Sequence, residues 1–142
     1  RQADGRMADH PLRLQIWNQM GCDSHAAVKA RVVQHGFSTA DFAALAPLVV
    51  EAAVQDCPGA KEIVQRSAAA LSNCISTVAQ QLSLRAPVVV CHGGAVTHLP
   101  EFRTAVQQAI RQSIPQAQWG KAKGDACDGA LQMAEALPLR PR

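Results

Sequence analysis

The residues with the clearest potential for chemistry lie in the stretch PVVVCHGGAVTHLPEF, residues 87–102. Gly93 and Gly94 follow an apolar run directly, His92 and His98 flank them, and a helical pattern begins a few residues later. In open α/β sheets, ligands lie beyond the carboxyl ends of strands, where glycine lets backbone N–H groups or a flat ring come close. The stretch predicts a strand, a ligand-binding turn and a helix. A tight turn without a ligand is the alternative interpretation.

Several well-defined sites are excluded at this turn. No GKS or GKT follows the glycines, and neither GxGxxG nor GxSxG occurs in the chain, so the P-loop, the dinucleotide fingerprint and the serine nucleophile elbow are absent. A metal site using His92 and His98 would need a third ligand, and Cys91 points to the opposite strand face from His92. We therefore expect neither a metal site nor a catalytic residue in this chain.

A second candidate segment is KGDACDGALQMA, residues 123–134. Asp125 stands near the start of an expected final helix, where a carboxylate can cap the helix and complement its dipole. Gly129 would let that helix pack closely on a sheet, or on the turn after Gly94. Capping and packing are favoured over catalysis for these residues.

The composition of the chain limits the class of protein to which both segments can belong. The chain has 142 residues, of which 48% are hydrophobic and 18% charged, which favours one folded domain. Its net charge of +3 is scattered without a basic run, so we expect no nucleic acid partner. No apolar stretch reaches the ~18 residues of a membrane span. The five cysteines include no CxxC pair, which favours free thiols and a cytoplasmic location.

The periodicity predicts about six helices and two short strands. The helices are expected within residues 10–21, 23–36, 38–56, 57–83, 99–115 and 124–137, and the strands within residues 86–94 and 116–122. Pro47 should kink or restart the third helix near Ala46. The first strand is apolar on both faces, as in a parallel sheet covered on both sides. Two strands do not form a sheet that can stand alone, so we expect further strands upstream of residue 1.

Two of the helices carry an expected buried face. In the second helix the inward residues would be Ala27, Val28, Val32 and Val33. In the long fourth helix they would be Ile63, Ala70, Cys74 and Val78, with Val64, Leu71 and Ile75 beside them.

Three segments in this order, DFAALAPLVVEAAVQD, VVVCHGGAVTHLPEF and GDACDGALQMA, resemble the C-terminal part of a known family. It is the BadF/BadG-type ATPase family, which includes N-acetylglucosamine and glucosamine kinases and belongs to the actin, hexokinase and Hsp70 superfamily. The resemblance runs from about Asp4 to Ala136. It implies an α/β fold, namely the helix-rich C-terminal portion of a ribonuclease H-like domain, whose sheet is completed by upstream sequence.

The resemblance also assigns residues. Residues 1–142 would be a single domain on the adenosine side of a two-domain enzyme, with ATP in the cleft between the domains. The matching positions are Gly93, Gly94 and Ala95 in the adenosine-binding turn, Phe42, Ala43 and Ala44 in a helix near the adenine, and Asp125 and Gly129 as structural residues near the site.

The chain departs from the family in what it lacks. The N-terminal Asp-x-Gly-x-Thr phosphate loop, the second phosphate-binding segment and the catalytic Asp have no match here. Phosphoryl transfer needs positioned phosphates, a metal bridge and a base. The resemblance thus implies that a complete protein transfers phosphate from ATP, with Mg²⁺, to an amino sugar bound mainly by the missing N-terminal part, and that this chain alone is inactive.

Two other functions stay open. One is the ATPase activator of a radical dehydratase or of benzoyl-CoA reductase. The other is a non-catalytic helical interaction domain. A homodimer is compatible with each of them.

Overall fold

The computed structural model describes residues 10–33 and 37–136. The described elements are α1 (Leu12–Gln19), α2 (His25–Val33), α3 (Thr39–Ala43), α4 (Ala46–Val54), α5 (Pro58–Gln81), β1 (Val88–Val89), α6 (Gly94–His98), α7 (Pro100–Ser113), β2 (Gln118–Trp119) and α8 (Ala126–Ala136). The predicted helix-rich α/β composition is confirmed. The helix end expected near Gly36 and the part of the family resemblance before residue 10 lie outside the described residues.

The N-terminal helices begin and end where local signals place them. The N–H of Gly21 donates to the carbonyl of Asn18, and the N–H of Cys22 donates to that of Trp17, which is the Schellman arrangement. Gly21 takes the positive φ of 65° that this arrangement requires. The Ser24 hydroxyl accepts from the N–H of Ala27, so Ser24 caps α2.

The third predicted helix is two helices. Ser38 and Asp41 form a capping box that starts α3. Pro47 lies in the first turn of α4, where its missing N–H leaves no hydrogen bond unmade. The restart expected near Ala46 is confirmed, because α4 begins at that residue.

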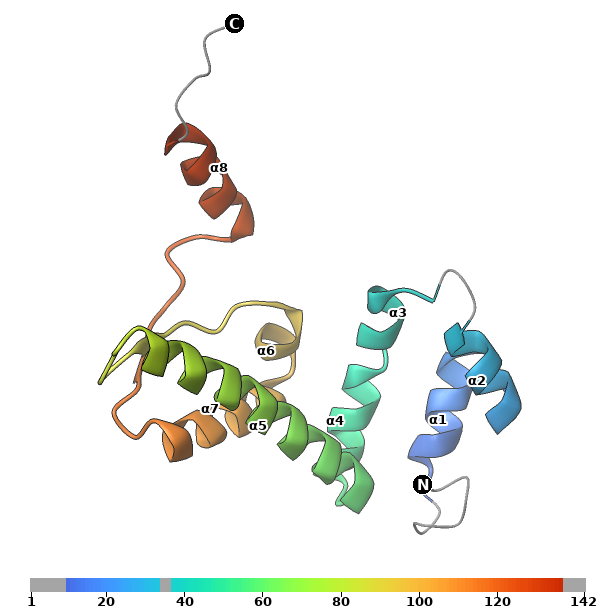
Figure 1. Cartoon of the computed structure of the whole chain (residues 1–142). Helices are drawn as coiled ribbons and strands as arrows, with labels where there is room; N and C mark the ends of the chain where they lie inside the picture. Colours follow the sequence, from blue (N-terminus) through green and yellow to red (C-terminus); the bar gives the residue numbers. More distant parts are fainter. Residues whose placement is uncertain (1–9, 34–36, 137–142) are drawn as a thin grey trace, which may run out of the picture.

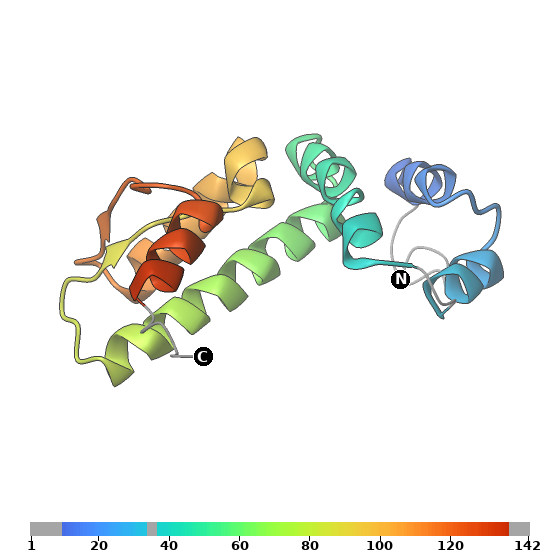
Figure 2. The ribbon, with the colours of Figure 1, turned by 90° about the horizontal axis from the view of Figure 1, so that it is seen from above.

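Two buried clusters hold the chain together, and α5 contributes to both. At the start of α5, Ala60 and the preceding Cys57 pack with Ala52 of α4 and Leu12 of α1. Further along, Ala68 packs with Val89 of β1 and with α7. In Figure 1, α5 runs from beside α4 to the loop that precedes β1, with α7 below it, and Figure 2 shows the same helix from above.

The predicted buried faces of two helices are only partly correct: Ala27, Val28, Val64 and Ile75 are half-buried, and the other residues named for these faces are exposed. On α5 the buried residues are Ala60, Ala68, Ser72 and Ala79, whereas Ile63, Ala70, Cys74 and Val78 are exposed. The reason is close packing: α7 lies against the small side chains of α5, and the larger apolar residues remain outside. On α2 no residue is buried, and Val32 and Val33 are 40% and 84% exposed.

The two strands are parallel, with Val88 opposite Gln118 and Val89 opposite Trp119. Val89 is 7% exposed against α5 and α7, but Val88 is 63% and Val90 46% exposed. The expectation that the sheet is covered on both sides is therefore wrong for the described residues. Side chains alternate along a strand, so Val88 and Val90 share the uncovered face.

The connection from β1 to α7 contains an additional short helix, α6, which the periodicity did not predict. Pro100 then occupies the first turn of α7, as a helix start favours. None of the helices in residues 10–33 and 37–136 combines the length and the apolar character needed to cross a membrane.

Candidate functional site

The turn after β1 has a backbone that only glycine adopts readily. Gly93 has φ 121° and ψ 157°, outside the regions open to residues with a Cβ atom. Gly94 then begins α6, and the carbonyl of Gly93 accepts the N–H of Thr97 at 3.0 Å. A Cβ atom built on Gly93 or on Gly94 meets no atom within 4 Å. The backbone of this turn is therefore uncovered, and the space beside it is open.

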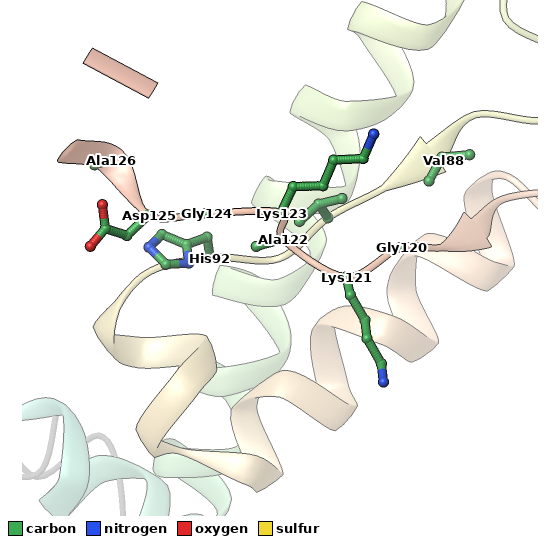
Figure 3. A pocket seen from close by; sticks show the side chains of 10 residues that line it. Val88, His92, Gly120, Lys121, Ala122, Lys123, Gly124, Asp125 and Ala126 are labelled. Atoms are coloured by element: carbon green, nitrogen blue, oxygen red, sulfur yellow. The ribbon is translucent and has the colours of Figure 1, made fainter. Parts of the chain in front are cut away.

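A cavity of about 650 Å³ lies on the uncovered face of the sheet, next to this turn. Val88 and Val90 form its apolar side, and the chain after β2 closes the other side, as Figure 3 shows. His92, immediately before Gly93, lies at one end. The remaining lining residues are Gly120, Lys121, Ala122, Lys123, Gly124, Asp125 and Ala126.

Gly120 is required by the sheet itself. A Cβ atom on Gly120 would lie 2.8 Å from Cγ1 of Val88 and 3.0 Å from Cγ2 of Val90. These distances are shorter than a normal carbon–carbon contact of about 3.5–4.0 Å. The missing side chain at Gly120 lets the end of β2 lie directly against the side chains of β1.

Asp125 forms the N-cap of α8. Its Oδ1 accepts the N–H of Cys127 at 2.7 Å and that of Asp128 at 3.0 Å, while Asp128 Oδ2 accepts the N–H of Asp125 at 2.8 Å. The backbone N–H groups of Asp128 and Cys127 hold the pKa of the Asp125 carboxyl below its usual 3.8, with a smaller contribution from the charge of His92. Figure 3 shows His92 and Asp125 beside one another.

The predicted site residues fall into two places. Gly93, Gly94 and Ala95 are consecutive at the end of β1, whereas Phe42, Ala43 and Ala44 lie in and just after α3. The ring of Phe42 is 49% exposed and packs edge-on against Phe37, with ring centroids 4.6 Å apart.

The two places do not meet in one cavity, and none of Gly93, Gly94 and Ala95 lines the cavity beside His92. Ala44 lines a small cavity of about 70 Å³ between α1, α2 and α3. This cavity shares no residue with the one beside His92. Gly129 lies on α8 with open space around its Cα.

Two features of the described residues bear on the chemistry of the site. Within residues 10–33 and 37–136, no cluster of three or more His, Cys, Asp or Glu side chains could hold a metal ion. Burial raises the pKa of the Cys91 thiol, which keeps it in the weakly nucleophilic protonated form. The lining of the cavity combines two valines, one histidine, two lysines and the carboxylate of Asp125.

Of the charged lining residues contributed by the chain after β2, sequence reasoning named Asp125 but missed Lys121 and Lys123. The signal for them was present. The segment QAQWGKA was predicted to be a strand, and in a parallel sheet the carboxyl ends of neighbouring strands meet at one edge. Residues following this strand were therefore bound to lie beside those following β1.

Comparison of the chain with protein-family models, curated proteins and solved structures found no match. Function therefore has to be argued from the site itself.

Proposed function

We propose that this chain is the adenosine-side portion of an ATP-dependent amino-sugar kinase, which in its complete form transfers the γ-phosphate of ATP to a hydroxyl of N-acetylglucosamine or glucosamine. The observation that supports the proposal is the turn at Gly93 and Gly94. It lies at the carboxyl end of a parallel strand, it has a backbone conformation specific to glycine, and it has open space on its outer side. Ligands of open α/β sheets bind at such positions.

The turn would contact the adenosine through its backbone. Because neither Gly93 nor Gly94 carries a side chain, a flat base or a ribose can approach the peptide planes closely. Ala95 adds only a methyl group. In this proposal, Phe42, Ala43 and Ala44 approach the adenine from the opposite side when the complete protein closes around ATP.

The phosphate chemistry belongs to other parts of the complete protein. The described residues offer no cluster of ligands for Mg²⁺. Transfer of a phosphoryl group depends on a metal that bridges the phosphates and on a base that orients the acceptor hydroxyl. The role of this chain is to bind and orient the nucleoside half of ATP. By itself it should not transfer phosphate from ATP.

The test is ADP release by the complete protein, measured with ATP and Mg²⁺ against a panel of amino sugars and a control without sugar. We expect release that depends on sugar, with N-acetylglucosamine or glucosamine preferred. ADP release that is the same with and without sugar would favour an activator ATPase over a kinase. No release, together with no ATP binding, would leave a non-catalytic interaction domain.

The variant Gly94→Val tests the site directly. Its side chain enters the open space beside the turn, so ATP affinity should fall by about tenfold or more, which corresponds to about 1.4 kcal/mol. The melting temperature should change little, because a Cβ at this position meets no atom within 4 Å. Ala70→Val, on the exposed side of α5, is the matched control and should bind ATP normally. Unchanged affinity in Gly94→Val would remove the turn from the ATP site.

A further inference from the structure

Helix α8 is amphipathic but has no packed face. Its polar residues Asp128, Gln132 and Glu135 recur at intervals of four and three, so they share one side of the helix. The rest of the surface is apolar or glycine, formed by Ala126, Cys127, Gly129, Ala130, Leu131, Met133, Ala134 and Ala136. No residue of α8 is buried, and Leu131 and Met133 are 61% and 74% exposed.

A helix as short as α8 is not expected to be stable with its apolar residues exposed. α8 has 11 residues. Isolated helices shorter than about 12–15 residues are marginal in water, and most helices in proteins depend on packing of an apolar face. The capping interactions at Asp125 favour the first turn only. A stable α8 therefore needs an apolar surface to pack against.

Such a surface lies within the same half of the chain. The uncovered face of the sheet presents Val88 and Val90, and Gly120 between them adds no side chain. This face borders the cavity of about 650 Å³. No charged group lies on β1 itself, so a helix docking there through its apolar side would bury no charge of the strand.

The connection between the two surfaces is short. Six residues, Gly120 to Asp125, separate β2 from α8. At full extension they reach about 20 Å, which keeps α8 close to the sheet at a high effective concentration. Ala126 of α8 already lines the cavity together with Val88 and Val90. Figure 1 shows α8 standing apart from α7, and in the view from above α8 projects over the same end of the molecule as the strands.

We propose that α8 docks on the uncovered face of the β1–β2 sheet and closes the cavity, with its apolar side on Val88 and Val90 and its polar side in solvent. The first residue of α8 already lies at that cavity, so docking extends an existing contact. The movement takes place in residues 121–124, because Gly120 stays paired with β1 through its N–H bond to the Val89 carbonyl at 3.0 Å. Docked α8 walls the cavity beside His92 and leaves the backbone of Gly93 and Gly94 at its rim. The docking does not depend on the proposed ATP site.

Amide hydrogen exchange on the full chain, followed by mass spectrometry, tests the docking. Two neighbouring substitutions form a matched pair. Met133→Asp places a charge on the apolar side of α8, where Met133 follows Gly129 and Ala130 at intervals of four and three. Gln132→Asp places the same charge on the polar side. Both positions are exposed in the undocked arrangement, so neither change disturbs the rest of the fold.

In the unsubstituted chain, peptides from residues 126–136 and 87–92 should exchange at least about tenfold more slowly than in Met133→Asp. Gln132→Asp should exchange like the unsubstituted chain. Equal exchange in all three proteins would overturn the proposal. So would protection that appears only at high protein concentration together with a dimeric mass, because the occupant would then be a second copy.

Discussion

The α5–α7 layer and the region of β1 and α8 are both rich in apolar residues. The apolar side chains are buried in the α5–α7 layer, but most of them are exposed in the region of β1 and α8. In the first, Val106 and Ile110 of α7 are 1% and 0% exposed. In the second, Val88 and Leu131 are 63% and 61% exposed. The amount of apolar sequence therefore does not decide burial. What decides it is whether a complementary surface is already in place.

Polar groups show the same difference. Ser72 is 1% exposed in the α5–α7 layer, and its hydroxyl lies 2.8 Å from that of Ser113, so its hydrogen bonding is satisfied. In β2, the indole N–H of Trp119 is buried and has no acceptor among the described residues. A buried donor without a partner is rare in folded proteins. The glycine turn follows β1, whose Val89 packs on α5 and α7 and whose Val88 and Val90 remain exposed.

Truncating a buried side chain in the α5–α7 layer should have the largest effect on stability. Ile110→Ala deletes three carbon atoms from a fully buried position, so the free energy of unfolding should fall by about 2–5 kcal/mol. Chemical denaturation measures this loss. Val33→Ala, at an 84% exposed position, is the control and should change stability by less than about 0.5 kcal/mol. Similar losses in both variants would mean that Ile110 is not in a packed core.

The contact between the strands should be sensitive to a much smaller change. Gly120→Ala adds one methyl group 2.8 Å from Cγ1 of Val88, and overpacking of this kind destabilises by about 1–3 kcal/mol. Gly94→Ala adds the same group in open space and should be tolerated. Thermal melting of the pair checks this. Equal melting temperatures would show that β2 does not lie against Val88 and Val90 as described.

The sequence predicted the elements better than it predicted their faces. Caps, prolines and glycines are local signals, so the ends of α1 and the break at Pro47 were foreseen correctly. The buried face of α5 was not, because hydrophobicity favours Ile63 and Val78, whereas close approach of α7 selects Ala68 and Ser72. Which side of a helix is buried depends on its neighbour, and the neighbour is distant in the sequence.

The candidate site was likewise predicted only where the signal was local in the sequence. The Gly93–Gly94 turn was predicted because glycine at the end of an apolar run is a local signal. Lys121 and Lys123 were missed, because they reach the cavity only through the parallel pairing of β1 with β2. The placement of Phe42, Ala43 and Ala44 beside the turn stays a prediction. It depends on the closure around ATP proposed above, which no local sequence signal can test.

The smallest effect should come from the cap of α8, and it should depend on pH. The pKa of Asp125 is lower in the folded chain than its usual 3.8, so the ionised carboxylate favours the helix. This contribution is complete above the unfolded pKa and is lost as the pH falls through the folded pKa, below 3.8. The amide NMR signals of Cys127 and Asp128, which donate to Asp125 Oδ1, should shift in that range.

A local readout is needed for this titration, because the N–H of Ser38 also holds the pKa of Asp41 low and α3 titrates in the same range. Asp125→Asn separates charge from capping: asparagine caps as well as aspartate but does not ionise. This variant should keep α8 helical at neutral pH and lose the acid-dependent shift. Asp125→Ala should weaken the first turn of α8 at every pH. If α8 responds to acid equally in all three proteins, the cap is not what couples this helix to pH, and the undocked helix must be held by a contact elsewhere.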